Sequence, residues 1–340
     1  MKFDYCIGNP PYQAENENNH RNPPVYHSFM DAAYTIADKV ELITPARFLF
    51  NAGQTPKNWN EKMLNDEHFK VLSFEKDGSV VFPNNDIKGG VVISLRDATK
   101  KFGKIGIFID SKQLNDIVNK VKPLITHSLT EIANPKSYYG FNEKLYIDYP
   151  TFKSRLTEGN EYIIDADIFQ KMPEIFIDRV EDESNYIVVH GRNPRGRVKK
   201  FINKKYIKNN EGLNKYKVFI TGANGSGKFG EALSSPFVAK PLNIHTQTYM
   251  SMGAFDSEFE ANACLKYICS KFGRTMLYVL KVTQNNPKDT WKYVPLQDFT
   301  EKSDIDWTKS VHEIDEQLYK KYKLSQEEID FIETNVKEMD

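Results

Sequence analysis

A short apolar segment that runs directly into two consecutive prolines constrains the fold of this chain more than any other feature. Residues 3–7 are typical of a strand, and Gly8, Asn9, Pro10, Pro11 and Tyr12 follow at once. Each proline fixes φ at about −65° and lacks a backbone N–H, so the strand has to end in a rigid turn. The glycine at position 8 gives the backbone room for a tight exit. The segment therefore predicts a strand that presents a fixed loop, followed by an aromatic ring.

Residues 1–110 alternate apolar and amphipathic segments. Three further strands are predicted at 40–44, 70–75 and 91–95. Between the first two strands, apolar residues recur at helical spacing, namely Tyr26, Phe29, Met30, Ala33, Ile36 and Ala37. Parallel neighbours need a long crossover connection, usually a helix, so we expect an α/β domain with a parallel sheet.

The pattern changes beyond this first domain. Residues 111–295 have shorter and less regular apolar segments, with many Tyr, Asn, Gly and Lys residues, which predicts an α+β domain rich in loops. One capped helix is expected there, starting with Ser257 and Glu260 and carrying an apolar face of Ala261, Leu265, Ile268 and Phe272.

Residues 296–340 are expected to form an acidic helical tail. Ser325 and Glu328 predict a second capped helix, whose buried face would hold Ile329, Ile332, Val336 and Met339. Acidity argues against contact with phosphate, so packing or subunit docking is the expected role.

Charge, cysteine content and hydropathy exclude several classes of protein. The 46 basic and 46 acidic residues cancel, so any attraction to nucleic acid has to come from a local patch. Cys6, Cys264 and Cys269 show neither C-x-x-C pairing nor the histidine spacing of a zinc site, so no metal is expected and a reducing, cytoplasmic location fits. No apolar run of membrane-spanning length and no signal-peptide pattern occurs, so no membrane association is expected.

The loop after the first strand has the groups needed to methylate an exocyclic amino group. The lone pair of such a nitrogen is delocalised into the ring, so two acceptors aimed at its hydrogens would have to polarise it. The side-chain oxygen of Asn9 could be one acceptor and the carbonyl of Pro10 the other, since Pro11 has no N–H to compete. Tyr12 would stack on a base rotated out of the duplex. The alternative is an ordinary loop, in which Asn and Pro simply start a turn.

The sequence resembles the TaqI-like class of adenine-specific DNA methyltransferases, which includes restriction-modification enzymes with a C-terminal specificity domain. The similarity covers residues 1–97 and is carried by Phe3 to Tyr12, Tyr26 to Asp38, Val40 to Leu49, Val81 to Pro83 and Gly90 to Leu95. It implies an incomplete Rossmann-like methyltransferase sheet, followed by a target-recognition domain that binds double-stranded DNA.

By the same resemblance, the site would hold an adenine and S-adenosylmethionine. Phe82 would stack on the adenine opposite Tyr12, and Phe29 together with Asn9 would line the cofactor pocket. The alternative for each phenylalanine is an ordinary position in the hydrophobic core.

The cofactor half of the resembled fold is expected to lie outside these residues. The family builds that half from a glycine-rich loop after an earlier strand and an acidic residue on the next strand. We expect either that a second polypeptide or an upstream segment supplies it, or that the chain is a degenerate or truncated enzyme. By itself the chain is expected to bind S-adenosylmethionine weakly or not at all.

The later glycine-rich run, Gly222 to Lys228, also mimics a nucleotide-binding P-loop. Phe229 stands where such a loop needs Ser or Thr to reach magnesium, so a surface loop near DNA phosphate is expected instead.

A basic segment between residues 190 and 228 is the expected DNA-binding surface. It contains Arg192, Arg195, Arg197, Lys199, Lys200 and Lys228. Lysine and arginine provide most of the affinity for DNA by neutralising phosphates, and arginine also contacts guanine edges. The alternative is a solvated basic face without a partner.

These observations favour a site-specific adenine methyltransferase of a restriction-modification system. A non-catalytic DNA-specificity subunit that retains an idle motif is the main alternative, and a nucleotide hydrolase built on the Gly222 loop is a weaker one. Methylation of the cytosine amino group remains open, as do the target sequence and any nuclease activity.

Overall fold

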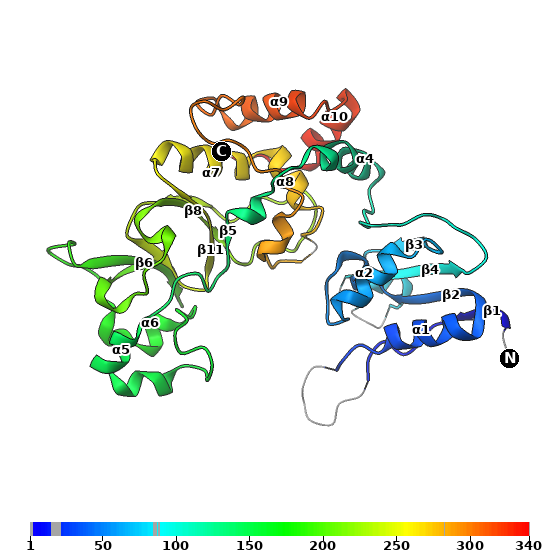
Figure 1. Ribbon diagram of the computed structural model, residues 1–340, viewed down its shortest axis with the longest axis horizontal. Helices are drawn as coiled ribbons and strands as arrows, with labels where there is room; N and C mark the ends of the chain where they lie inside the picture. Colours follow the sequence, from blue (N-terminus) through cyan, green and yellow to red (C-terminus); the bar gives the residue numbers. More distant parts are fainter. Residues whose placement is uncertain (1–2, 15–21, 84–86, 88, 282, 340) are drawn as a thin grey trace. The chain divides into compact units, whose positions relative to one another are not determined.

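The computed structural model describes the whole chain except residues 1–2, 15–21, 84–86, 88, 282 and 340 (Figure 1). The chain forms two compact units, Met1–Lys112 and Gln113–Asp340. Both mix helices with sheets, so the molecule has the α/β character expected from its sequence.

The first unit is built on a four-stranded sheet with the order β1-β2-β4-β3. All four predicted strands are present, extended by a few residues, as β1 (Phe3–Gly8), β2 (Ala37–Pro45), β3 (Phe69–Glu75) and β4 (Val91–Asp97). The predicted crossover helix is α1 (Tyr26–Ile36), which connects the parallel neighbours β1 and β2.

The expectation of a wholly parallel sheet is wrong, because β4 runs antiparallel to both of its neighbours, β2 and β3. Between β3 and β4 the described chain forms only the single-turn helix α3 (Gly78–Val81). A parallel crossover needs a dozen or more residues, usually with a helix long enough to cover the sheet. The chain therefore reverses direction after β3, and β4 lies between β3 and β2 in the sheet.

The core of the first unit lies on one face of this sheet. Helices α1 and α2 (Lys57–Asn65) pack there with the 3-10 helix η1 (Ala46–Phe50), and Met30, Phe48 and Phe69 have no exposed surface. The ring centroids of Phe48 and Trp59 lie 5.3 Å apart, in an edge-to-face contact. This packing fixes the ends of β1 and β2, from which the candidate site is built.

Strand β1 is an edge strand with an apolar exposed surface. Phe3, Tyr5 and Ile7 alternate along it and are 52%, 59% and 74% exposed. Cys6, which points the other way, packs against the core of the unit. The open backbone edge therefore coincides with a row of uncovered apolar side chains.

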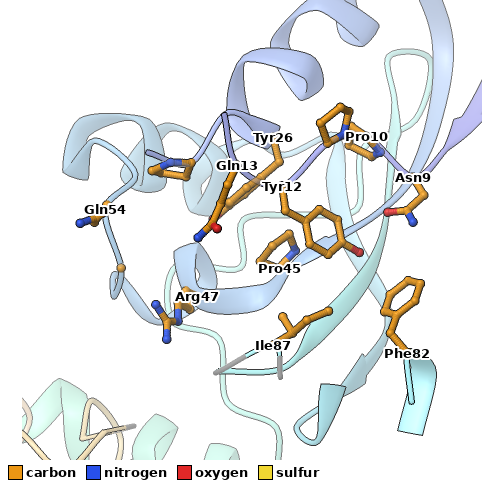
Figure 2. Close-up of a pocket in the computed structure, with 13 residues that line it drawn as sticks. Asn9, Pro10, Tyr12, Gln13, Tyr26, Pro45, Arg47, Gln54, Phe82 and Ile87 are labelled. Atoms are coloured by element: carbon orange, nitrogen blue, oxygen red, sulfur yellow. The ribbon is translucent and has the colours of Figure 1, made fainter. Parts of the chain in front are cut away.

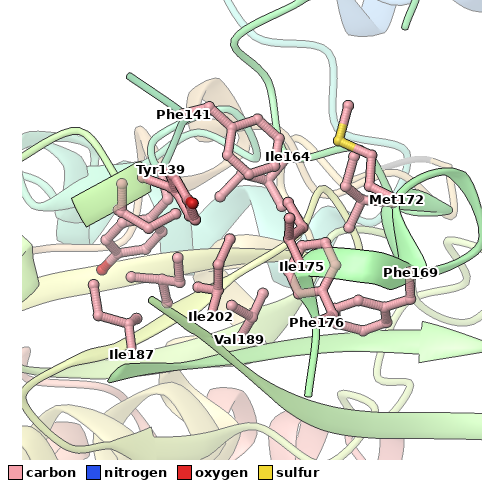
Figure 3. Packing of buried hydrophobic residues seen from close by; sticks show 14 of the residues in the cluster. Tyr139, Phe141, Ile164, Phe169, Met172, Ile175, Phe176, Ile187, Val189 and Ile202 are labelled. Carbon is pink, nitrogen blue, oxygen red and sulfur yellow. The ribbon is translucent and has the colours of Figure 1, made fainter. Parts of the chain in front are cut away.

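The second unit contains two sheets, ordered β10-β6-β7 and β5-β11-β8-β9. Their strands are β5 (Ala133–Asn134), β6 (Tyr186–Asn193), β7 (Gly196–Asn203), β8 (Tyr216–Thr221), β9 (Phe237–Ala239), β10 (Asn243–His245) and β11 (Tyr249–Phe255). Ile187 and Val189 of β6 and Ile202 of β7 face a large buried cluster that includes Phe141, Phe169 and Met172 (Figure 3). The β6–β7 hairpin is thus anchored by one face.

The helices of the second unit are short and mostly capped by side chains. They are α4 (Lys112–Val121), α5 (Glu143–Asp148), α6 (Ile168–Lys171), α7 (Glu258–Cys269), α8 (Lys271–Leu277), α9 (Val311–Lys321) and α10 (Gln326–Asn335). The 3-10 segments are η2 (Lys122–Leu124), η3 (Leu129–Glu131), η4 (Pro150–Arg155), η5 (Pro173–Ile175), η6 (Lys204–Tyr206), η7 (Glu211–Asn214) and η8 (Lys288–Trp291).

Both helices predicted from their caps are present. Ser257 accepts a hydrogen bond from the Glu260 N–H at 3.2 Å, and Ser325 forms a full capping box with Glu328. The first helix is shorter than its apolar face suggested, because Ser270 has an extended backbone and caps a new helix, α8, which contains Phe272.

The C-terminal helices pack within the second unit. The carboxylate of Asp315 in α9 accepts hydrogen bonds from the backbone N–H groups of Lys271 and Phe272, at the start of α8. Burial raises the pKa of Asp315 to about 6. Ile314, Leu318 and Ile332 have no exposed surface, so these helices are part of the core.

Candidate functional site

A pocket of about 760 Å³ lies where β1 and β2 end in the first unit (Figure 2). Three separated segments line it, contributing Asn9, Pro10, Pro11, Tyr12, Gln13, Pro24 and Tyr26, then Pro45, Arg47, Gly53 and Gln54, then Phe82 and Ile87. Its volume lies within the range of about 300–1,000 Å³ usual for ligand sites. The fold thus brings the predicted Asn-Pro-Pro-Tyr loop and Phe82 into one cavity.

The loop is held in place by backbone hydrogen bonds to the segment that enters α1. The Val25 N–H donates to the Tyr12 carbonyl at 3.1 Å, and the Ala14 N–H donates to the Pro23 carbonyl at 3.0 Å. Gly8 has no positive φ, and a Cβ there would meet Leu42 at an ordinary 3.6 Å. The exit from β1 therefore depends on the two prolines and this pairing, and Gly8 itself is the last residue of the strand.

Two oxygen acceptors remain available at this loop. Within the described residues, neither the Asn9 side-chain oxygen nor the Pro10 carbonyl accepts a hydrogen bond. Pro11 has no N–H, so the turn itself does not use the Pro10 carbonyl. Both acceptors belong to residues that line the pocket.

Tyr12 and Phe82 touch each other across the pocket. Their ring centroids lie 6.2 Å apart with an interplanar angle of 80°, which is an edge-to-face contact. Burial raises the pKa of the Tyr12 hydroxyl, and this buried oxygen has no hydrogen-bond partner among the described residues. Tyr12 is therefore a neutral ring, suited to stacking against a flat ligand.

Phe29 lies away from these residues. It is 46% exposed on α1 and does not line the pocket. Its helix presents the neighbouring residues Tyr26, Met30 and Ala33 to the core instead.

The basic segment expected to face DNA separates into two groups. Arg192, Arg195, Arg197 and Lys199 are exposed on the β6–β7 hairpin, whose turn is closed by a hydrogen bond from the Arg195 N–H to the Asn193 side chain. Lys200 instead forms an ion pair of 2.8 Å with Asp178. Further along the same segment, Lys205 and Lys215 pair with Asp148 and Asp256.

The glycine-rich run Gly222 to Lys228 surrounds an internal carboxylate. The backbone N–H groups of Ser226 and Gly227 donate to Glu231 at 2.9 and 3.1 Å, and Lys228 is exposed. The run joins β8 to β9, and the described chain between these strands contains no helix. Its amide groups therefore bind the protein's own anion.

Several residues of the pocket were not singled out from the sequence. Arg47, Gln13 and Gln54 line it, and so does Tyr26, whose pKa burial raises to about 12. No local motif marks these positions, although Arg47 follows the Thr-Pro-Ala turn at the end of β2.

Neither a metal cluster nor a membrane span is found in the described part of the chain. Its residues contain no group of three or more His, Cys, Asp or Glu side chains that could hold a metal ion. None of the described helices is long and apolar enough to cross a membrane.

Comparison with known proteins finds a curated relative, a solved structure and a protein family that are similar to this chain. A curated protein of Mycoplasma pneumoniae, described as an uncharacterized adenine-specific methylase, is 30% identical over 95 residues. The matched segment is 27% of this chain and 22% of that protein, so it spans about a fifth of the relative's length.

Among solved structures, the type IIG restriction endonuclease BpuSI aligns with 88% of this chain and 44% of its own, at 11% identity. The TM-score is 0.30, which is too low to assign a shared fold.

Residues 1–82, which contain the Asn-Pro-Pro-Tyr loop and Phe82, match the Eco57I restriction-modification methylase family. The resemblance expected from the sequence is thereby confirmed, since this part of the chain is similar to restriction-modification methylases.

Proposed function

We propose that the chain is the catalytic and target-recognition part of a DNA methyltransferase of a restriction-modification system. The reaction would transfer a methyl group from S-adenosylmethionine to the exocyclic amino group of adenine. The observation that carries this proposal is the pocket that unites Asn9, Pro10, Tyr12 and Phe82 within a segment of the methylase family.

The chemistry follows from the two acceptors of the loop. The Asn9 oxygen and the Pro10 carbonyl would each accept a hydrogen bond from the target amino group. This interaction draws the nitrogen lone pair out of conjugation and stabilises the charge that develops as the nitrogen becomes tetrahedral. S-adenosylmethionine would supply the electrophilic methyl group.

A base would enter between Tyr12 and Phe82. Stacking on both faces needs about 3.5 Å on each side, or about 7 Å between parallel rings. The observed rings are 6.2 Å apart and nearly perpendicular. Admission of a base thus requires one ring, which we propose to be Phe82, to turn parallel to Tyr12 and move outward by about 1 Å.

We further propose that structure outside these residues covers β1 and completes the cofactor site. The edge of β1 is open, and Phe3, Tyr5 and Ile7 along it are exposed. Exposed apolar edge strands are normally paired or covered. Phe29 does not line the pocket that contains Asn9, so this pocket does not unite the two residues expected to contact the cofactor. An additional segment or a second polypeptide would place the cofactor against Phe29 and Asn9.

The β6–β7 hairpin would contact the DNA. It exposes Arg192, Arg195, Arg197 and Lys199, whereas Lys200 is neutralised by Asp178. Exposed arginines at a hairpin turn can reach phosphates and base edges. Arg197 would exchange its hydrogen bond to the Ser234 carbonyl, of 2.8 Å, for such a contact. Lys228 lies on the Gly222 loop and would add a phosphate contact.

The proposal is tested by the methylated nucleoside that the protein makes. The chain would be expressed, with whatever polypeptide completes the β1 edge, in a host whose DNA lacks N6-methyladenine. Mass spectrometry of the digested DNA should find N6-methyl-2′-deoxyadenosine with the native chain and none with Asn9→Ala. Asn65→Ala, which removes an amide from α2 outside the pocket, is the matched control and should retain methylation.

Three outcomes would contradict the proposal. If Asn9→Ala methylated DNA as well as the native chain, Asn9 would not take part in the reaction. Detection of N4-methylcytosine in place of N6-methyladenine would show that the target base is cytosine. DNA binding without any methylation would favour a specificity subunit instead.

A further inference from the structure

Two distant segments of the second unit pair just beyond the end of β8. Ala223 forms an antiparallel β-bridge with Asn285. Backbone hydrogen bonds of 2.7 and 3.1 Å close the bridge on its two sides, from the Asn224 N–H to the Gln284 carbonyl and from the Asn286 N–H to the Gly222 carbonyl. Residues 222–224 and 284–286 thus form a short ribbon, the 223–285 ribbon, whose backbone is fixed by its own pairing.

Two side-chain amides of this ribbon, those of Gln284 and Asn285, are exposed to solvent. Within the described residues, neither amide forms a hydrogen bond. The next amide, that of Asn286, is fully buried, and its oxygen accepts a hydrogen bond from the Thr290 hydroxyl at 3.3 Å. The ribbon therefore presents two free amides, each with donors and an acceptor, from a backbone that the third amide helps to anchor.

Asn224 joins the ribbon to the β6–β7 hairpin. Its side-chain oxygen accepts hydrogen bonds from the backbone N–H and from the hydroxyl of Ser234, the latter at 2.6 Å. The Ser234 carbonyl in turn accepts a hydrogen bond from Arg197 at 2.8 Å. The ribbon and the hairpin that carries the exposed arginines are therefore neighbours in the second unit.

A lysine without an anionic partner lies against the same ribbon. A Cβ added to Gly222 would come within 2.8 Å of the Lys136 Nζ, so the glycine leaves room for this ammonium group. Among the residues that the structure describes, Lys136 has neither an ion pair nor a hydrogen bond, and its partial burial lowers its pKa. A partly desolvated, unpaired cation gains from an anion that binds beside it.

DNA supplies the groups that these side chains lack. Its phosphates are anions for an ammonium group, and the amide of Asn or Gln can form a pair of hydrogen bonds with N6 and N7 of adenine in the major groove. A rigid backbone lowers the conformational entropy that such contacts cost. The neighbouring hairpin arginines would bring the same duplex to this end of the second unit.

We propose that the 223–285 ribbon reads bases of the DNA target, with Gln284 and Asn285 contacting adenine edges and Lys136 neutralising an adjacent phosphate. This inference rests on the proposed function, because the duplex has to bind to the second unit through the β6–β7 hairpin. It assigns part of the sequence specificity to residues outside the basic segment 190–228.

Base reading is tested on the site that the full chain prefers. Sequencing of the duplexes that the native chain retains from a randomised library gives this site, which should contain adenine. Fluorescence anisotropy then measures the ratio of the affinity for the preferred duplex to that for a scrambled duplex. Joint replacement of Gln284 and Asn285 by Ala should lower this ratio at least about fivefold and leave the affinity for the scrambled duplex unchanged.

Asn262→Ala is the matched control for this double variant. Asn262 is exposed on α7, and its side-chain amide donates within its own helix, to the Glu258 carbonyl at 2.8 Å. This variant should keep the native ratio of affinities. Circular dichroism of each variant would establish that the chain is folded.

The phosphate contact is tested by the salt dependence of binding. Lys136→Gln should weaken binding to both duplexes alike and lower the slope of log affinity against log salt by about one. Lys205→Gln is the control, because Lys205 already forms an ion pair of 3.0 Å with Asp148. It should retain the native slope.

The outcomes separate this inference from the proposed function. An unchanged ratio in the Gln284 and Asn285 variant, or an equal loss of affinity for both duplexes, would overturn base reading by the ribbon. An unchanged salt slope in Lys136→Gln would overturn the phosphate contact. In each of these cases the hairpin would remain the DNA surface. If the native chain bound no duplex, the DNA recognition in the proposed function would fail together with the inference.

Discussion

Tyr12 and Phe82 lie where the proposed function places the target base, so loss of either ring should weaken binding of the base. Phe82→Ala should weaken binding of 2′-deoxyadenosine by roughly tenfold, since stacking on an aromatic ring contributes about 1–3 kcal/mol per base. Phe82→Tyr retains the ring and should bind normally. Nuclear magnetic resonance titration measures both variants, and equal affinity of Phe82→Ala and the native chain would exclude Phe82 from the base site.

A second residue makes the second unit sensitive to acid. His245 is fully buried among aromatic rings, and this burial lowers its pKa to about 3. The unfolded chain takes up a proton near the ordinary pKa of about 6.5, whereas the folded chain resists it, so stability is lost as pH falls below about 6.5. The loss should be on the order of 3 kcal/mol by pH 4.

His245→Phe tests this origin of the acid sensitivity. Urea unfolding between pH 4 and pH 7 should show a shallower pH dependence in this variant than in the native chain. His312, which is exposed on α9, provides the control, and His312→Phe should keep the native pH dependence. An unchanged slope in His245→Phe would assign the acid sensitivity to other groups.

At the scale of single residues, the sequence was informative only where function is local. Asn9 to Tyr12 are contiguous, so their chemistry could be inferred from one short segment. The place of Arg47 in the pocket could not be found in this way, because the cavity is assembled from three distant segments of the chain. Phe29, which the resemblance assigns to the cofactor, is exposed on α1 and does not line the pocket of Tyr12 and Phe82, so its role stays a prediction.

The β6–β7 hairpin is the element on which DNA binding can be tested. Neutralising Arg192, Arg195 and Arg197 together should weaken binding to duplex DNA and lower the slope of log affinity against log salt by about one for each phosphate that is no longer neutralised. Double replacement of Lys205 and Lys215 by Gln is the matched control, because both lysines already pair with carboxylates. An unchanged salt slope in the arginine variant would show that the hairpin is not the DNA surface.

The elements themselves were predicted better than their arrangement. The four strands of the first unit could be predicted from the spacing of their apolar residues. The two capped helices could be predicted from the Ser and Glu residues at their starts. The direction of β4 does not, because it is decided by the short connection after β3. The role of the Gly222 loop likewise depends on Glu231, which fills the loop from outside the motif.

For the whole molecule, the two compact units predict two unfolding transitions. Met63 is 1% exposed in the core of the first unit, and Leu318 has no exposed surface in the second. Truncation of either side chain should cost about 2–5 kcal/mol, because it removes apolar packing and leaves a cavity. In calorimetry, Met63→Ala should lower the Tm of one transition by several degrees and Leu318→Ala that of the other.

The same pair of variants tests whether the C-terminal helices belong to the second unit. Leu318 lies in α9, within residues 296–340, which were expected to form a separate acidic tail. A single transition shifted by both variants would contradict two independent units. A third transition, shifted by Leu318→Ala alone, would show instead that residues 296–340 unfold independently of the rest of the second unit.

The pocket at the end of β1 is tested most directly by locating a bound base in it. Nuclear Overhauser effects would be measured between H2 and H8 of bound 2′-deoxyadenosine 5′-monophosphate and the ring protons of Tyr12 and Phe82. We expect effects to both rings at once, with the amino group next to the Asn9 side chain. A nucleotide that binds without contacting either ring would contradict the proposed site.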